Sequence, residues 1–473
     1  MPTAPKILVV GGGISGLACA WRLRQLSVPF LLLERRGRFG GVVETAEEKG
    51  FRFDVGPQSF TKTPALSELI EQVGLNGELL RADPRAPRYI LHRGRLVPAP
   101  FSPPRLLTTP LLSARTKLRI LAEPFLRSYP PDEDESIAAF VRRKFGEDLL
   151  ANLVAPFVSG VWAGDPEKLS LGAAFPAVRQ LEEKYGSVIR GAMKQRKSAG
   201  KSSPKSSGER PSLCNFRGGV PALIGALASR LGDSACTGAE ITAIRRPATS
   251  SFDVDYRVAG KTESARVAAL VVSTPASEAG GLLRGLDPRF AELLGEIDYA
   301  SVAQVSAGYR VDQIRQREAK NGLNGFGFLV PRSERLRLLG TVWNSSLFPG
   351  RAPEGMASFT SFLGGMTDPE IVSRVPDEIA AIAHSELSSV LGISGAPAVQ
   401  RVCRWQRALP QYSIGHRDLI AALVELCAAT PGIFLAGNYF GGPSIGACVE
   451  HANKVAEQAA GFLGGSARPS DNA

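Results

Sequence analysis

Three glycines near the amino end have the spacing of a turn that binds the phosphates of a dinucleotide. Gly11, Gly13 and Gly16 follow the apolar run KILVV (6–10) and lead into an apolar segment over 17–26, so we expect a strand, a glycine turn and a helix. Gly11 allows a tight turn, Gly13 lets the backbone approach a pyrophosphate, and Gly16 lets the helix pack closely on the strand. The helix N-terminus favours the negative phosphates.

A carboxylate and a second glycine pair complete this predicted site. The next predicted strand ends at Glu34, where a carboxylate can accept hydrogen bonds from ribose hydroxyls. In the segment RFGGVVET (38–45), Gly40 and Gly41 let a second stretch of backbone close over the pyrophosphate. Arg38 offers that pyrophosphate a positive charge. Together these features predict a bound dinucleotide.

The other end of the chain repeats the pattern. The apolar run GIFLAGN (432–438) is followed by GGPSIG (441–446), which opens a predicted helix over 447–463. This arrangement again directs a helix N-terminus at an anion. The apolar segment AALVVSTP (268–275) predicts a further strand. We therefore expect both ends of the chain to build one nucleotide-binding domain.

Length and composition limit the other possibilities. The chain has 473 residues, of which 44% are hydrophobic, so it is long enough for about three domain-sized units. No apolar run reaches the ~18 residues of a membrane-spanning helix, and the amino terminus lacks a signal peptide, so we expect a cytoplasmic protein. The six cysteines and four histidines lack metal-ligand spacing, so we expect no metal.

The net charge of +11 is compatible with an anionic partner. No nucleic-acid motif accompanies the charge, so we expect no nucleic-acid partner. The Ser- and Lys-rich segment 194–210 is expected to be a solvated loop. Residues 95–127 instead combine Leu, Phe and Pro with Arg and Lys, a composition suited to an amphipathic surface that touches lipid head groups. We therefore expect peripheral membrane association.

Several segments resemble one enzyme family. RFGGVVET (38–45) and FDVGP (53–57) resemble segments of the FAD-containing amine oxidase and desaturase superfamily. PFVSGVWAGDPEKLS (156–170) resembles a stretch of the oxygen-dependent protoporphyrinogen oxidases, the FAD enzymes of haem synthesis. Further matches follow in the family's order at 88–90, 94–96, 182–187, 216–220, 325–331, 345–349, 351–353, 410–412 and 415–416. The chain is identified on these segments as a member of that family.

The resemblance implies a bound FAD. No His or Cys stands in a flavin-attachment motif, so the flavin is expected to be non-covalent. The expected cofactor-binding residues are Gly11, Gly13, Ile14, Ser15, Gly16, Glu34, Arg35, Arg38, Gly40, Gly41, Gly56, Pro57, Ile241, Thr274, Trp405, Gly437, Asn438, Ser444, Ile445 and Cys448.

The resemblance also implies a substrate and its site. A porphyrinogen would lose six electrons to the flavin, and O2 would reoxidise the flavin and form peroxide. No side chain is expected to be catalytic, because the flavin carries out the chemistry. Arg88 would pair with a propionate, Leu329 and Val342 would sandwich a pyrrole ring, and Phe362 would stack on another. Gly160, Ala163 and Gly164 would belong to a loop that approaches the ligand. Val342 is smaller than the Leu of some relatives.

Other functions stay open at this point. The substrate could be protoporphyrinogen IX or coproporphyrinogen III, and the four propionates of the latter could use Arg95 and Lys168 as further cations. An amine oxidase, a carotenoid desaturase and a redox-silent porphyrin carrier are the alternatives from other classes. Transfer of the product to a ferrochelatase and assembly into a homodimer are also open.

These inferences together predict an α/β protein. A Rossmann-type FAD-binding domain would comprise 1–86, 212–297 and 401–463. A mainly helical, membrane-facing domain would cover 87–195 at the mouth of the substrate pocket. A substrate domain with an antiparallel sheet would cover 298–400, where runs such as 302–309, 327–330, 338–343 and 358–362 alternate like strands. A flexible loop is expected over 196–211 and a tail over 464–473.

Overall fold

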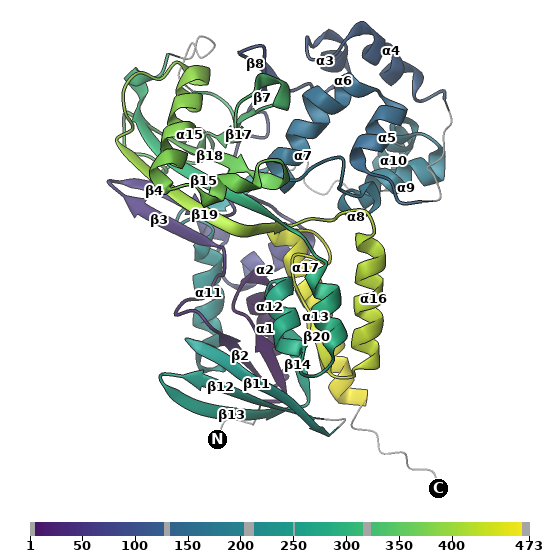
Figure 1. Ribbon diagram of the computed structural model, residues 1–473, viewed down its shortest axis with the longest axis vertical. Coiled ribbons are helices and arrows are strands. Elements are labelled where there is room, and N and C mark those ends of the chain that lie inside the picture. Colours follow the sequence, from purple (N-terminus) through teal and green to yellow (C-terminus); the bar gives the residue numbers. More distant parts are fainter. Residues whose placement is uncertain (1–4, 127–132, 203–211, 249–250, 316–322, 466–473) are drawn as a thin grey trace.

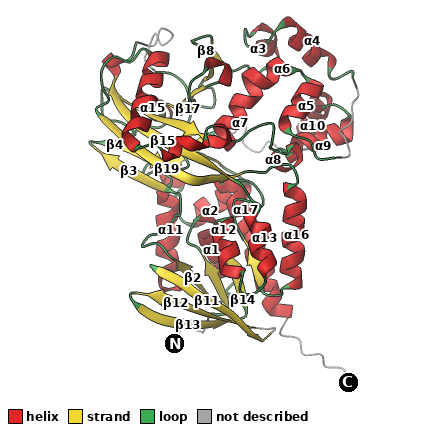
Figure 2. Ribbon diagram, in the orientation of Figure 1, coloured by secondary structure: helices red, strands yellow, loops and turns green. Residues whose placement is uncertain are grey.

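The computed structural model describes residues 5–126, 133–202, 212–248, 251–315 and 323–465. Figure 1 shows two tiers, and the first and last described residues of the chain lie in the lower tier. The lower tier contains segments from both ends of the chain, coloured purple and yellow. The upper tier has strands on one side and a group of helices on the other, as the colouring in Figure 2 makes clear.

A five-stranded parallel sheet forms the centre of the lower tier. Its order is β10 (Ala235–Thr237), β2 (Phe30–Glu34), β1 (Ile7–Val10), β14 (Ala269–Val272) and β20 (Ile433–Leu435). All residues of β1 and β14 are buried, as in parallel sheets that are covered on both faces. The predicted strands near 6–10, 268–275 and 432–438 are therefore confirmed, and segments from both ends of the chain share one sheet.

Helices and a second sheet cover the two faces of this sheet. One face packs against α1 (Ile14–Gln25), α2 (Pro64–Gln72), α11 (Pro221–Leu231) and α17 (Ile445–Gly465). The other packs against α12 (Ala276–Leu283), α13 (Pro288–Gly295), α16 (His416–Ala429) and the antiparallel strands β11 (Ala239–Ala248), β12 (Ser251–Val258) and β13 (Lys261–Val267). A small sheet of β5 (Phe60–Thr61), β9 (Leu213–Phe216) and β6 (Leu79–Arg81) completes this tier. The pair of β3 (Glu44–Glu48) and β4 (Phe51–Val55) lies instead at the lower edge of the upper tier in Figure 1, where Phe51 and Phe53 cluster with Val399 and Met356.

A seven-stranded sheet forms one side of the upper tier. Its order is β19 (Val399–Pro410), β15 (Tyr299–Arg310), β18 (Met356–Gly364), β17 (Leu338–Val342), β16 (Gly327–Leu329), β7 (Arg88–His92) and β8 (Arg95–Pro98). The four strands predicted within 298–400 are present. One face of this sheet packs against α15 (Pro376–Leu391).

Two domain boundaries and one pairing differ from expectation. β7 and β8 lie in 87–195, which was expected to be mainly helical and separate from the sheet domain, yet they extend the sheet. β19 lies largely in the segment assigned to the FAD-binding domain, yet it is the opposite edge strand of the same sheet. The sheet is also not wholly antiparallel, since β16 and β7 pair in parallel. These pairings join segments far apart in the chain, and local apolar patterns do not specify such partners.

The helical side of the upper tier comprises α3 (Pro103–Thr108), α4 (Ala114–Ala122), α5 (Ile137–Lys144), α6 (Glu147–Leu149), α7 (Ala155–Trp162), α8 (Leu171–Ala174), α9 (Pro176–Tyr185) and α10 (Val188–Ser202). A π-helical turn over Leu150–Val154 leads into α7. Ser136 caps α5 by accepting a hydrogen bond from the Ala139 N–H.

Two predicted loops are wrong in part. The loop expected to contain Gly160, Ala163 and Gly164 begins inside α7, and the loop expected over 196–211 begins inside α10. Glycine-rich and lysine-rich composition favoured loops, but Gly160 of α7 packs directly against Leu329, and such tertiary contacts override local propensity. Residues 203–211 lie outside the described residues. Helix α17 ends at Gly465, so all but the first two residues of the predicted tail (464–473) also lie outside them.

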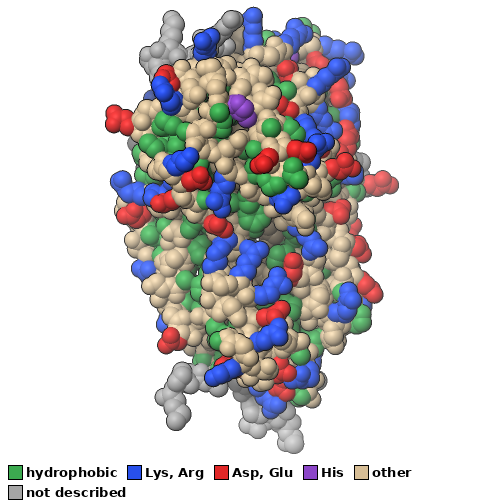
Figure 3. Space-filling view, turned by 60° about the vertical axis from the view of Figure 1, so that its left-hand side comes forward, with side chains coloured by type: hydrophobic (Ala, Val, Ile, Leu, Met, Phe, Trp, Pro, Cys, Tyr) green, Lys and Arg blue, Asp and Glu red, His purple; other side chains and the backbone are tan. Residues whose placement is uncertain are grey.

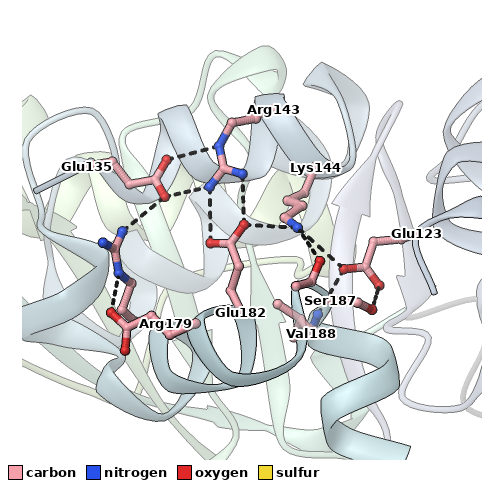
Figure 4. Close-up of polar contacts among 10 residues, drawn as sticks. Glu123, Glu135, Arg143, Lys144, Arg179, Glu182, Ser187 and Val188 are labelled. Atoms are coloured by element: carbon pink, nitrogen blue, oxygen red, sulfur yellow. Dashed lines mark hydrogen bonds and ion pairs between the residues drawn. The ribbon is translucent and has the colours of Figure 1, made fainter. Parts of the chain in front are cut away.

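A buried ionic network joins four of these helical elements (Figure 4). Lys144 Nζ on α5 lies 2.9 Å from Glu182 Oε1 on α9, and both side chains are almost completely buried. Arg143 pairs with Glu182 and Glu135. Glu123, after α4, accepts hydrogen bonds from Ser187 Oγ and from backbone N–H groups at the start of α10. Removing one partner would leave an unpaired buried charge and would destabilise the packing of these helices.

Candidate active site

The first glycine turn has the geometry that a pyrophosphate requires. Gly11 has a φ of +103°, and a Cβ at Gly16 would overlap the carbonyl oxygen of Gly11, so both positions require glycine. At Gly13, by contrast, a Cβ would meet no atom within 4 Å. Gly13 is the N-cap of α1 and brings no side-chain cap. Space and helix N–H groups are therefore open to an anion here.

The segment after Glu34 lies against this turn. The Gly40 N–H donates to the Gly12 carbonyl at 2.8 Å. A Cβ at Gly41 would lie 3.5 Å from the Gly13 Cα. Glu34 Oε2 accepts from the Gly12 N–H at 2.6 Å, which places the carboxylate at the turn where a ribose was expected. The predicted closure of a second backbone stretch is thus present.

Arg35 and Arg38, the two arginines predicted to bind the cofactor, differ in their surroundings. Arg38 lies 2.6 Å from Glu44 Oε2 and donates to the Gly41 carbonyl at 3.1 Å. It therefore holds the second stretch in place, rather than offering an uncompensated charge. Arg35 is exposed.

The carboxyl-terminal glycine turn meets the first one. Ser15 on α1 and Cys448 on α17 share a hydrogen bond, and burial raises the pKa of the Cys448 thiol to about 11. The Ala436 N–H donates to the Val272 carbonyl, so Gly437 follows β20 at the same sheet edge. Parallel strands place ligands at this carboxyl edge. Ser444 Oγ accepts from the Ala447 N–H, and Ile445 is buried.

Unpartnered polar atoms beside these turns fit a large ligand. The Thr274 hydroxyl, just after β14, and the Trp405 indole N–H on β19 are buried without a hydrogen-bond partner among the described residues. Buried polar atoms are normally paired. Together with the open space at Gly13, they fit a dinucleotide that spans from the glycine turns to β19. Within the same residues, no cluster of His, Cys, Asp and Glu could hold a metal ion.

Two further predicted cofactor residues lie at the edges of this region. Gly56 has a φ of +109° and a Cβ there would overlap the Val42 carbonyl oxygen, so it must be glycine. Pro57 follows it and is half-buried. Ile241 on β11 packs against a buried cluster that contains Leu33, the residue before Glu34. Asn438 follows Gly437 and is half-buried.

The predicted substrate residues lie on one face of the seven-stranded sheet. Arg88 and Val342 are both paired with Gly327 of β16. Two residues along the strands, Leu329 and Phe362 are both paired with Gly340 of β17. Side chains alternate between the faces of a sheet, so rows two residues apart share a face. The register thus brings together four residues from three distant segments, opposite the face that α15 covers.

Helix α7 covers part of this face. A Cβ at Gly160 would overlap the side chain of Leu329, so glycine at 160 admits the leucine. Ala163 ends α7 with a φ of +49°, and its carbonyl accepts from the Met366 N–H at 2.8 Å. Such a strained non-glycine backbone persists only where its surroundings hold it. Gly164 is buried against Leu169 and Gln411. Gly160 and Ala163 thus contact the substrate face, whereas Gly164 packs behind it.

Arg88 begins β7 at the outer part of this face. Its guanidinium lies 5.3 Å from the ring centre of Phe326 and 5.4 Å from that of Phe101. Partial burial lowers the pKa of Arg88, yet an arginine stays protonated at neutral pH. The aromatic rings can steady the cation, and its N–H groups suit a carboxylate.

Gln304, which the sequence analysis missed, links the substrate face to the glycine turns. It lies in β15 in the same row as Phe362. Its amide oxygen accepts from the Gly56 N–H at 3.0 Å, and its amide nitrogen donates to the Asp54 carbonyl at 2.8 Å. A single amide in the apolar run ASVAQVSAGY was the signal that could have identified it.

Comparisons with known proteins agree with this geometry. The family model described as flavin containing amine oxidoreductase matches residues 14–460. Protoporphyrinogen oxidase 1 of spinach chloroplasts is 37% identical over 96% of this chain and 84% of that protein. Coproporphyrinogen III oxidase of Bacillus subtilis (strain 168) is 28% identical over 97% and 98%.

Solved structures share the fold. A crystal structure from Exiguobacterium sp. 255-15, assigned to the protoporphyrinogen oxidases, has a TM-score of 0.78 at 24% identity over 97% of this chain and 99% of that one. Cyclohexylamine oxidase from Brevibacterium oxydans has a TM-score of 0.68 at 17% identity, over 98% and 100%. With both glycine turns and the sheet face in place, the chain belongs to the flavin-containing amine oxidoreductase family as an FAD-dependent enzyme of the protoporphyrinogen oxidase group.

Proposed function

We propose that this enzyme oxidises protoporphyrinogen IX to protoporphyrin IX, with O2 as the final electron acceptor. The observation that carries the proposal is the shared sheet face of Arg88, Val342, Leu329 and Phe362, joined through Gln304 to Gly56. The relatives that are 35–37% identical carry the name protoporphyrinogen oxidase, which supports the same substrate.

The side chains of this face suit a tetrapyrrole. Leu329, Val342 and Phe362 offer apolar contacts to pyrrole rings, and Arg88 offers a planar donor to a propionate. When bound, FAD supplies the capacity to accept hydride equivalents from the substrate. The chain itself binds and orients the macrocycle and excludes water from it, and no side chain is assigned as an acid or a base.

Coproporphyrinogen III is the second candidate substrate. Relatives named coproporphyrinogen III oxidase are 25–28% identical over 96–97% of this chain. Arg95 pairs with His92 across β7 and β8, so it lies on the same face as Arg88 and could meet an additional propionate. Lys168 is exposed between α7 and α8.

Parallel turnover of the two porphyrinogens tests both candidates. Oxygen uptake and porphyrin fluorescence are followed with each substrate under identical conditions. We expect a higher kcat/KM for protoporphyrinogen IX. A higher kcat/KM for coproporphyrinogen III would favour the second candidate, and FAD-loaded protein that oxidises neither would contradict the proposed function.

We further propose that the enzyme binds a membrane surface peripherally from the cytoplasm. Residues 101–126 expose large apolar side chains, namely Phe101, Leu107, Leu118, Leu121, Phe125 and Leu126. Arg105, Arg115 and Arg119 are exposed among them. Apolar and basic side chains together suit the interface of an anionic bilayer. Within the described residues, no helix is long and apolar enough to cross a membrane. On the face drawn in Figure 3, basic and acidic side chains are interspersed.

A further inference from the structure

Tyr412 lies where the carboxyl-terminal glycine turn, α7 and α16 come together. The residue follows β19 and is 2% exposed. Its ring meets Trp162, the last residue of α7, edge-on at 4.9 Å and stacks on His416, the first residue of α16, at 4.1 Å. The ring therefore touches a helix of the upper tier and a helix of the lower tier at once.

The hydroxyl of Tyr412 holds the carboxyl-terminal glycine turn at two points. It donates to the Asn438 carbonyl at 2.6 Å and accepts from the Gly442 N–H at 2.8 Å. Burial raises the pKa of Tyr412, so the hydroxyl keeps the proton that it donates. One oxygen atom thus fixes the spacing between two backbone groups of a turn that lies at the FAD site.

Residues 411 and 412 also bond to the end of α7 and to the start of α8. The Tyr412 carbonyl accepts from the Ser170 N–H at 2.8 Å, and the side-chain amide of Gln411 donates to the Trp162 carbonyl at 3.0 Å. Gly160 of α7 and Ala163, which follows the last residue of α7, contact the substrate face. The segment 411–412 is therefore bonded both to the flavin turn and to the helix that covers the substrate.

We infer that Tyr412 is a positioning residue, which sets the 438–442 turn relative to α7 and thereby the bound flavin relative to the substrate face. The phenol is the only polar group of Tyr412 that reaches the turn. The inference depends on FAD binding and not on which porphyrinogen is oxidised.

Removing the hydroxyl alone tests this role. In Tyr412→Phe the ring contacts persist while the Asn438 carbonyl and the Gly442 N–H lose their partner. Leaving two partly buried backbone groups of this turn unpaired should weaken FAD binding by about 10-fold or more. The absorbance spectrum and the reduction potential of the flavin that remains bound should also shift, because the turn that contacts it relaxes. A residue that only stabilised the fold would leave the potential unchanged.

Tyr309→Phe is the matched control. Tyr309 is buried, its hydroxyl lies 2.8 Å from His384 Nδ1, and its ring stacks on that histidine. It belongs to the cluster under α15, on the opposite face of the sheet. We expect FAD affinity and reduction potential to be unchanged in this variant, even if its unfolding temperature falls.

The outcomes separate the alternatives. FAD affinity and reduction potential that stay at wild-type values in Tyr412→Phe would overturn the inference, as would equal changes in both variants. If Tyr412→Phe does not fold, hydrogen exchange in the FAD-bound wild-type enzyme replaces it, and rapid exchange of the Gly442 amide would overturn the inference. Neither measurement uses a porphyrinogen, so failure of the proposed substrate would leave this test intact.

Discussion

The flavin turns and the substrate face of this enzyme are built in different ways. At the turns, backbone geometry does the binding, so Gly11, Gly16 and Gly56 are required by close backbone approach or a positive φ. On the substrate face, ordinary leucine, valine and phenylalanine side chains are brought together by strand register. A site formed by backbone turns requires glycines at fixed spacing, which can be recognised in the sequence. A site formed by side chains that strand pairing brings together has no such local pattern.

A substitution at Gly13 should have the largest effect, and it tests the first half of this comparison. A Cβ there meets no protein atom, so Gly13→Val should fold but should hold its side chain where the pyrophosphate belongs. We expect colourless protein and a loss of activity of more than ~100-fold, with flavin content measured by absorbance after denaturation.

Gly225→Val provides the control for Gly13→Val. Gly225 is a helical glycine of α11 with equally open space, and we expect normal flavin content in this variant. The same denaturation step shows whether the wild-type flavin is non-covalent. Normal flavin in Gly13→Val, or flavin that stays attached to unfolded protein, would contradict these expectations.

Arg88→Ala tests the second half of the comparison. If the guanidinium pairs with a propionate, its loss should cost about 2 to 4 kcal/mol of substrate binding, and KM should rise by ~30-fold or more. FAD content should stay normal, because Arg88 lies on the substrate face and not at the glycine turns. Arg88→Lys should recover only part of the loss, since a point charge does not reproduce a planar donor.

Arg95→Ala is the matched control for Arg88. Arg95 lies on the same face but on the edge strand β8, and we expect a nearly unchanged KM for protoporphyrinogen IX. Steady-state kinetics with this substrate give the KM of both variants. If the two KM values were equal, Arg88 would not be the propionate-binding residue.

The same contrast explains what the sequence could predict. The strand, turn and helix at Gly11–Gly16, the second stretch at Gly40–Gly41 and the helix after Gly446 were predicted from glycine spacing, because such spacing has a direct physical meaning. Arg88, Leu329, Val342 and Phe362 came only from the family resemblance. Glycine at 160 suggested a loop, whereas it lies in a helix and makes room for Leu329.

Long-range partners account for the remaining errors. β7 finds its parallel partner β16 across more than half of the chain, and no local periodicity specifies that pairing. Gln304 and Tyr412 gain their roles only through contacts with Gly56 and with the turn that contains Gly442.

The protonation of His451 should make the stability of the FAD-binding tier depend on pH. It lies in α17, its ring stacks on Phe440, and burial, aided by Lys454, lowers its pKa from 6.5 to about 4. Because the folded pKa lies below the unfolded one, the unfolded state binds the proton first. The stabilisation is complete above about pH 6.5 and is lost as the pH falls toward 4, by up to about 3 kcal/mol.

Chemical denaturation between pH 7 and pH 4.5 measures this loss. His451→Phe should lose less stability than the wild-type enzyme over that range. His92→Gln, on the partly exposed strand β7, should follow the wild-type curve. Parallel curves for His451→Phe and the wild type would exclude His451 as the source, and would leave His416, whose pKa burial also lowers, as the next residue to replace.

The smallest expected effect concerns the exposed surface near the substrate face. Phe125 is 81% exposed and Leu118 is 66% exposed, and neither contacts a glycine turn. Each should contribute about 1 kcal/mol to binding of anionic vesicles if it enters the lipid interface in part. Leu118→Ser and Phe125→Ser should therefore each weaken co-sedimentation with phosphatidylserine vesicles by about fivefold, while flavin content is unchanged. Val424→Ser, which replaces an exposed apolar side chain of α16 in the lower tier, is the control and should bind as the wild type does. Added salt should weaken binding of all variants, because basic side chains near an anionic surface are screened over about 8 Å at physiological ionic strength. If vesicle binding changed neither with salt nor with these substitutions, the membrane contact would lie elsewhere on the protein. The membrane would then not bind beside the substrate face, which residues 101–126 adjoin through the contact between Phe101 and Arg88.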